Sequence, residues 1–84
     1  MEELIQLCKQ NGDVGVTGFT PNEIGNYLED NGYTYNESES RVSFGYTEVI
    51  FVFDGTDGQF EIYVNVVDLE VELTFIPAEE DYWN

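Results

Sequence analysis

The chain has 84 residues, of which 42% are hydrophobic and twelve are Phe or Tyr, and its eighteen Asp and Glu against two basic residues give a net charge of -16. The length predicts a single domain, 1–84, with a thin core, and the apolar and aromatic content excludes a disordered acidic tail. The charge itself works against folding, because self-repulsion opposes a compact state.

Two short helices are predicted in the N-terminal half. The first covers residues 2–11, where apolar side chains recur on one face. The second has the strongest local signal in the chain: Thr20 fits the N-cap, Pro21 the first helical position and Glu23 the reciprocal position of a capping box. Gly32 then follows the last turn as a left-handed stop. Between the helices, a short strand or a loop is expected.

The period of the hydrophobic residues changes to two after Arg41. The run EVIFVF at 48–53 is nearly continuous, as expected of a central strand, and DGTDG predicts a turn into the next alternating run. The parity slips between Val66 and Val67, which predicts a bulge or a turn. We therefore expect an α+β domain in which two short N-terminal helices pack on an antiparallel sheet of three to five strands.

The last strand-like segment, VVDLEVELTF, alternates apolar residues with acids. On an extended strand, Asp68, Glu70 and Glu72 are expected about 6.6 Å apart on one face, with Glu61 on a neighbouring row. A surface selected for solubility carries both signs of charge, but this half of the chain contains no basic residue. Since one strand of duplex DNA carries a charge about every 3.4 Å of axis, the pattern predicts a face that imitates a phosphate track.

Four further acids are expected to extend this row. Glu29 and Asp30 fall in the last turn of the second helix, where carboxylates oppose the helix dipole, so local stability does not explain them. Glu37 and Glu39 follow that helix in the sequence ESES. All four are therefore candidate partner-binding residues.

Two apolar residues are expected on the same acidic face. If the alternate residues of EVIFVF face the helices, Ile50 and Val52 emerge on the opposite side of the sheet. Either Tyr63 or the C-terminal tail covers them, or they form an apolar pocket that receives a nonpolar side chain of the partner. Tyr82 and Trp83 are further candidate anchors, because aromatic residues dominate interface hot spots.

Metal and catalytic alternatives receive less support. Asp54, Asp57 and Glu61 surround the DGTDG turn and could offer oxygen ligands to calcium, but the spacing is not that of an EF-hand and Asp-Gly turns are common for conformational reasons. Glu70 and Glu72 could form a carboxylate pair, yet the chain has no histidine and no phosphate-binding loop. We expect no enzyme activity, no metal and no cofactor. The lone cysteine, without a histidine partner, is expected to be a core residue.

The order of elements resembles that of a known family. A short helix, a brief extended segment, a second helix opened by Pro21 and Glu23, and then antiparallel strands resemble the phage uracil-DNA glycosylase inhibitors. The resemblance implies a small acidic protein that imitates DNA and blocks a repair enzyme. A Gln-Glu-Ser-Ile run precedes the second helix in that family, whereas this chain has Val16 to Phe19 there, so no functional residue is transferred. Anti-restriction and anti-CRISPR proteins belong to the same broad class.

These patterns predict a non-enzymatic DNA-mimic inhibitor that occupies the basic cleft of a nucleic-acid-binding enzyme, such as a nuclease, a CRISPR effector, a restriction enzyme or a DNA glycosylase. Direct binding to nucleic acid is not expected. Alternatives are an immunity protein that neutralises a cognate nuclease toxin, and an acidic adaptor domain. No secretory signal or apolar span is evident, so the cytoplasm of a bacterial host cell is the expected location, without membrane contact. The chain is expected to be a monomer or a homodimer.

Overall fold

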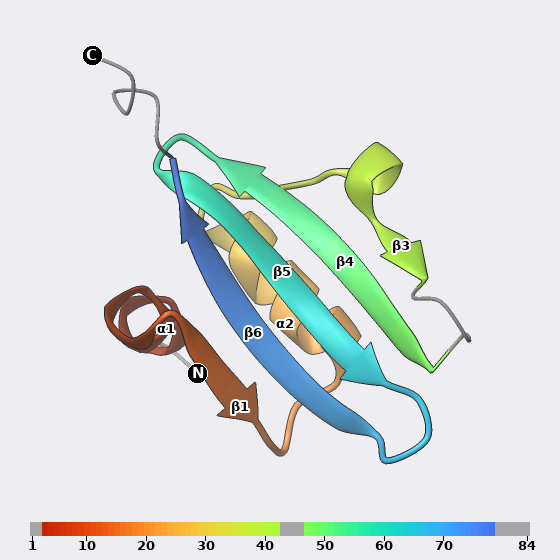
Figure 1. Cartoon of the computed structure of the whole chain (residues 1–84). Helices are drawn as coiled ribbons and strands as arrows, with labels where there is room; N and C mark the ends of the chain where they lie inside the picture. Colours follow the sequence, from red (N-terminus) through yellow and green to blue (C-terminus); the bar gives the residue numbers. More distant parts are fainter. Residues whose placement is uncertain (1–2, 43–46, 79–84) are drawn as a thin grey trace.

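The computed structural model describes residues 3–42 and 47–78, which form two α-helices and a six-stranded antiparallel sheet (Figure 1). In chain order the elements are α1 (Leu4–Asn11), β1 (Asp13–Val16), α2 (Pro21–Asp30), β2 (Thr34–Tyr35), the short 3₁₀ helix η1 (Glu37–Glu39), β3 (Arg41–Val42), β4 (Glu48–Gly55), β5 (Gly58–Asn65) and β6 (Glu70–Pro77). The α+β class and the antiparallel sheet with two helices are confirmed. Six strands are present because two dipeptides, β2 and β3, both pair with the outer edge of β4.

The strands follow the order β1-β6-β5-β4-β2, with β3 on the same edge of β4 as β2. A tight hairpin joins β4 to β5, and a second hairpin joins β5 to β6. The register places Phe51, Ile62 and Leu73 side by side across the three long strands. Because side chains alternate along a strand, this register gathers the apolar residues of all three strands on one face.

Both helices pack against that apolar face. Figure 1 shows α2 behind the sheet, and Cys8 of α1 joins Ile24 and Leu28 of α2 in one core with the alternate residues of the long strands. The buried core comprises Cys8, Val16, Ile24, Leu28, Tyr33, Phe53, Phe60, Ile62 and Leu73. In a domain this small, the burial of these side chains is the main favourable term for folding.

The second helix begins with the predicted capping box. The N–H of Thr20 donates to Glu23 Oε1 at 2.8 Å, and the N–H of Glu23 donates to Thr20 Oγ1 at 3.2 Å. Pro21 occupies the start of the helix, and Gly32, with φ of 95°, follows its end in the left-handed conformation. The start and stop signals of α2 are therefore confirmed.

The last strand begins later than the alternating pattern indicates. β6 starts at Glu70, and the residues between β5 and β6 form a turn. Within this turn, Val67 and Leu69 are exposed instead of continuing the core face. The side-chain oxygen of Asn65 accepts hydrogen bonds from the N–H groups of Val67 and Asp68 at 2.9 and 3.0 Å. This local turn replaces strand pairing and accounts for the predicted parity slip.

Candidate functional site

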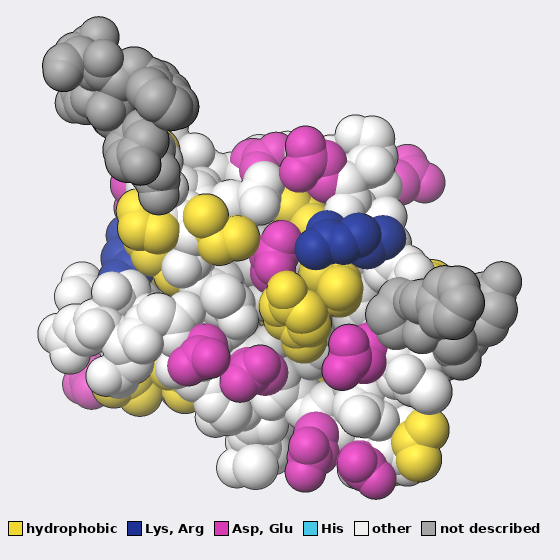
Figure 2. Space-filling view, viewed as in Figure 1, with side chains coloured by type: hydrophobic (Ala, Val, Ile, Leu, Met, Phe, Trp, Pro, Cys, Tyr) yellow, Lys and Arg dark blue, Asp and Glu magenta, His cyan; other side chains and the backbone are white. Residues whose placement is uncertain are grey.

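The face of the sheet opposite the helices is acidic, and we call it the open face. Its side chains alternate with the core residues of the three long strands: Glu48, Ile50, Val52, Asp54, Gln59, Glu61, Tyr63, Asn65, Glu70, Glu72, Thr74 and Ile76. Figure 2 shows Asp and Glu side chains spread over this face around a small apolar centre. The twofold period of the strands therefore places several acidic side chains on this face, around a buried apolar centre.

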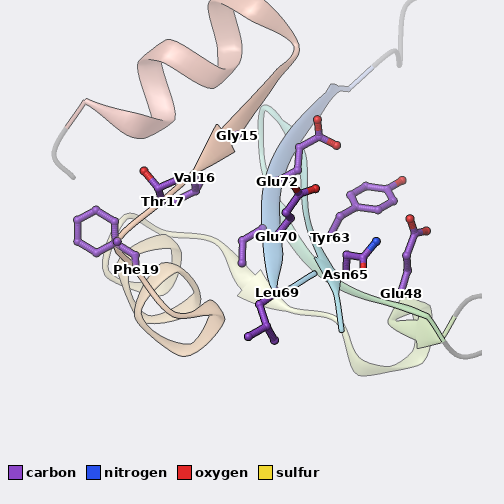
Figure 3. A pocket seen from close by; sticks show the side chains of 12 residues that line it. Gly15, Val16, Thr17, Phe19, Glu48, Tyr63, Asn65, Leu69, Glu70 and Glu72 are labelled. Atoms are coloured by element: carbon purple, nitrogen blue, oxygen red, sulfur yellow. The ribbon is translucent and has the colours of Figure 1, made fainter. Parts of the chain in front are cut away.

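A groove of about 660 Å³ crosses the open face where β6 begins. Glu70 and Glu72 stand in it on β6, Tyr63 and Asn65 on β5, and Glu48 on β4 (Figure 3). Asn65 is the cross-strand partner of both Glu70 and Glu48. Since neighbouring strands lie about 4.8 Å apart, the backbones that carry Glu48 and Glu70 are about 9.6 Å apart. The groove is thus lined by three carboxylates from β4 and β6, and the phenol of Tyr63 and the amide of Asn65 lie between them on β5.

Glu48 is the groove carboxylate that is missing from the predicted acidic row. It opens the segment EVIFVF, in which it has the same parity as Ile50 and Val52. The alternation that placed those two residues on the acidic face was therefore a sufficient signal for Glu48 as well.

Glu61 lies at the centre of the open face, but it is only 6% exposed. Arg41 Nη2 lies 3.5 Å from Glu61 Oε2, and the hydroxyl of Tyr63 donates to Glu61 Oε1 at 2.8 Å. The hydrogen bond to this carboxylate, followed by burial, raises the pKa of Tyr63, because both favour the neutral phenol. Glu61 is therefore a buried, paired carboxylate rather than a member of an exposed row.

Ile50 and Val52 lie on the open face, as predicted, but both are buried. Tyr63 is the cross-strand neighbour of Ile50 on one side, and Arg41 is its neighbour on the other. Val52 has the paired Glu61 beside it. These neighbours close the centre of the face, so the described residues show no open apolar pocket at Ile50 and Val52.

The predicted row of evenly spaced acids is shorter than expected. Asp68 lies in the turn between β5 and β6, so only Glu70 and Glu72 share the strand face. The candidate anchors Tyr82 and Trp83 lie outside the described residues.

The acids of the second helix do not extend the groove. Glu29 and Asp30 end α2, on the helical side of the sheet, where Glu29 lines a hollow together with Tyr35 and Phe51. The sheet separates them from the open face (Figure 1). The expectation that they continue the acidic row is wrong, because α2 covers the face of the sheet opposite the open face.

A second group of acids lies at the other end of the open face. Glu37 and Glu39 form η1 beside the edge of β4. The side-chain amide of Gln59 donates to Glu39 Oε1 at 3.4 Å and to Asp54 Oδ1 at 2.8 Å. Gln59 and Asn65 stand at opposite ends of β5, so this group lies about 20 Å from the groove along the strand.

The acids around the DGTDG turn have separate partners. Asp57 accepts hydrogen bonds from the ammonium of Lys9 and from the hydroxyl of Tyr33, and the contact with Lys9 lowers the pKa of Asp57. Asp54 instead accepts from amide side chains, and Glu61 pairs across the open face. Within residues 3–42 and 47–78, no group of acids converges as a metal site.

Both basic residues of the chain are bound to its own carboxylates. Lys9 pairs with Asp57 and Arg41 with Glu61, and these are the two ion pairs in the part of the chain that the structure describes. Neither of these ion pairs involves Glu70 or Glu72. The groove therefore presents a negative field to an approaching molecule.

The one thiol of the chain, Cys8, lies away from the groove. Cys8 is buried beneath the sheet, and its Sγ–H donates to the carbonyl oxygen of Leu73 at 3.2 Å. Burial raises the pKa of Cys8 to about 11, so the thiol is protonated at neutral pH.

Among the described residues, no helix has the length and apolar character that crossing a membrane requires. Comparisons of the chain with protein-family models, with curated proteins and with solved structures found no match.

Proposed function

We propose that this protein is a non-enzymatic inhibitor that imitates nucleic acid and occupies the basic cleft of a host defence or repair enzyme, in the manner of anti-CRISPR, anti-restriction or uracil-DNA glycosylase inhibitor proteins. The observation that carries this proposal is the groove on the open face. Glu48, Glu70 and Glu72 line it, and neither ion pair of the described residues involves Glu70 or Glu72. A surface of one sign attracts a partner of the opposite sign.

The geometry of the groove suits a cleft built for phosphates. Glu70 and Glu72 are two residues apart on one strand and hence separated by about 6.6 Å, close to two nucleotide steps of duplex axis at about 3.4 Å each. Glu48 adds a carboxylate across the groove. A protein cleft with lysine and arginine at phosphate spacing would meet these carboxylates in place of the backbone.

The same charge argues against other partners. At a net charge of -16, the protein is repelled by nucleic acid and by anionic membrane surfaces, so a basic protein is the partner we propose. We place the encounter in the bacterial cytoplasm, where such enzymes act. The helix, short strand, helix and antiparallel strand order on which the resemblance to uracil-DNA glycosylase inhibitors rests is also the order of the elements in this structure.

The test is affinity capture from bacterial lysate at low and at high salt, with three baits. The first bait is the unaltered chain, the second carries Glu70→Lys with Glu72→Lys, and the third carries Glu29→Lys with Asp30→Lys on the helical side as a charge-matched control. Retained proteins are identified by mass spectrometry, purified and assayed for inhibition, with purified bacterial uracil-DNA glycosylase assayed in parallel as a defined probe.

The proposal expects one nucleic-acid enzyme in stoichiometric amount on the first and third baits, lost at high salt and lost from the second bait. That enzyme should be inhibited in competition with its nucleic-acid substrate. The proposal is wrong if no nucleic-acid enzyme is retained or inhibited, or if the second bait retains it as well as the first. Retention of many basic proteins on all baits would show a non-specific surface and would also refute it.

A further inference from the structure

The turn between β5 and β6 exposes three aliphatic side chains at one tip of the sheet. Val66, Val67 and Leu69 are 45%, 70% and 79% exposed. We call these three residues the hydrophobic tip. Leu69 also lines the acidic groove, next to Glu70 (Figure 3). An apolar projection therefore stands directly beside the proposed binding surface.

The backbone of the hydrophobic tip is held in place. The side chain of Asn65 accepts hydrogen bonds from the N–H groups of Val67 and Asp68, and the N–H of Val66 donates to the carbonyl of Thr47 at 2.9 Å. These bonds tie the turn both to its own strand and to the residue before β4. A fixed apolar projection loses little conformational freedom on binding, which favours affinity.

Leu69 stands in a backbone conformation that does not suit it. Its φ of 59° makes it the one non-glycine residue with positive φ in the described part of the chain. Asn and Gly adopt this left-handed region readily, whereas a leucine there is strained. Residues kept in strained conformations are found preferentially at functional sites. At this position an exposed leucine is thus disfavoured by its backbone conformation and by its contact with water.

The surrounding charge indicates what covers the hydrophobic tip. Asp68 lies within the turn and Glu70 beside it. Two copies of the tip brought together would juxtapose these acids, and an anionic bilayer would repel them. A basic protein surface is attracted instead. Charge complementarity therefore favours, as the partner of the hydrophobic tip, an apolar pocket on another protein with lysine or arginine at its rim.

We propose that the hydrophobic tip is the anchor of the complex: Leu69, supported by Val67, enters an apolar pocket at the margin of the target enzyme's basic cleft. This inference rests on the proposed function and deepens it. The groove carboxylates would set the association rate and its salt dependence, and the tip would set the dissociation rate. Removing one buried anchor side chain is expected to weaken binding about 10- to 100-fold.

The experiment compares the unaltered chain with Leu69→Asn and with the control Leu7→Gln, which changes a 45% exposed leucine on the surface of α1. The probe is the enzyme captured and purified in the affinity experiment, and its association and dissociation rates are measured at two salt concentrations. Thermal unfolding of each variant is measured in parallel. Binding to an anionic bilayer is tested with vesicles of equal parts phosphatidylcholine and phosphatidylglycerol. Pairing with a second copy of the chain is tested by sedimentation of the free protein.

For Leu69→Asn we expect faster dissociation from the enzyme, an unchanged salt dependence and an equal or higher melting temperature, because asparagine relieves the strained backbone. Leu7→Gln should leave both rates unchanged. The tip is not the anchor if Leu69→Asn dissociates like the unaltered chain; in that case the proposed function still stands as long as Glu70→Lys with Glu72→Lys abolishes capture. Vesicle binding or a dimer that depends on Leu69 would also overturn the inference. If no enzyme is captured at all, both proposals fail together.

Discussion

The guanidinium of Arg41, on β3, lies 3.5 Å from the carboxylate of Glu61, on β5, so this ion pair spans the intervening strand β4. Arg41→Gln would leave the buried carboxylate of Glu61 with the hydroxyl of Tyr63 as its hydrogen-bond partner among the described residues. Because an uncompensated buried charge is costly, we expect a loss of about 1–3 kcal/mol in the free energy of unfolding, measured by urea denaturation.

The matched variant for this ion pair is Glu61→Gln, which removes the charge but keeps a side-chain oxygen for Tyr63. It should destabilise less than Arg41→Gln, and combining the two changes should recover part of the loss. Equal stability of Arg41→Gln and the unaltered chain would show that the pair contributes nothing to the fold. Because Glu61 is buried, Glu61→Gln should also affect partner binding far less than changes at Glu70 and Glu72.

The acids at the end of α2 predict a gain in stability on charge reversal. Glu29 and Asp30 lie in the last turn of the helix, where the backbone carbonyls make a partly negative end. Each change to lysine should raise the free energy of unfolding by about 0.3–1 kcal/mol, with the gain shrinking in high salt. Thermal unfolding at two salt concentrations measures this. A loss of stability would mean that these carboxylates have a structural role on the helical side.

The contact between Lys9 and Asp57 predicts how stability depends on pH. The pKa of Asp57 is lowered from 3.8, so its contribution is present above that pH and is lost as the pH falls through the lower folded value. The pKa of Lys9 is raised from 10.5, so its contribution is present below that pH and is lost as the pH rises through the higher folded value. Between these two pH limits the contribution of the pair to the free energy of unfolding should be constant.

The variant Asp57→Asn removes the charge that pairs with Lys9 and keeps a side-chain oxygen for the hydroxyl of Tyr33. The two side chains of the pair are 35% and 45% exposed, so screening keeps the contribution below about 1 kcal/mol. Melting temperatures of the variant and the unaltered chain should differ by a constant few degrees between about pH 5 and pH 9, and the difference should shrink towards both extremes. A difference that does not change from pH 3 to pH 11 would contradict the role of this ion pair.

The second glycine of DGTDG predicts a large effect of a single methyl group. Gly58 has a φ of 151°, and a Cβ there would lie 2.5 Å from the carbonyl oxygen of Ile76. Because backbone must move to admit it, Gly58→Ala should cost more than about 2 kcal/mol in urea denaturation. The exposed Gly12→Ala, which has open space around its Cβ position but a φ of 89°, is the control for backbone strain without a clash.

The structure indicates why parts of the fold could be predicted from the sequence. The start of α2 depends on Thr20, Pro21 and Glu23, which lie within four consecutive residues, so a short sequence window contains the whole signal. The α+β class likewise follows from the change of period after Arg41. Helix caps and the period of the hydrophobic residues can be predicted from a sequence because they do not depend on tertiary contacts.

Features that depend on register could not be predicted in the same way. The pairing of Arg41 with Glu61 requires β3 to align with β4 and β4 with β5, and the two residues of β3 are too few to show a period. The turn before β6 contains no glycine or proline, and the side chain of Asn65 makes it. For this reason alternation correctly placed Glu70 and Glu72 on the open face, but it wrongly extended the row to Asp68, which lies in that turn.

Because Cys8 is buried beneath the sheet, its thiol can report the opening of the domain core. A thiol without solvent exposure, bonded to Leu73 and with its pKa raised to about 11, reacts with alkylating or disulfide reagents only when the core separates. The rate of modification of the intact protein therefore measures the opening of the domain without any added label. A partner that binds the native fold must slow that reaction in proportion to its occupancy, so a complex can be detected before its chemistry is known.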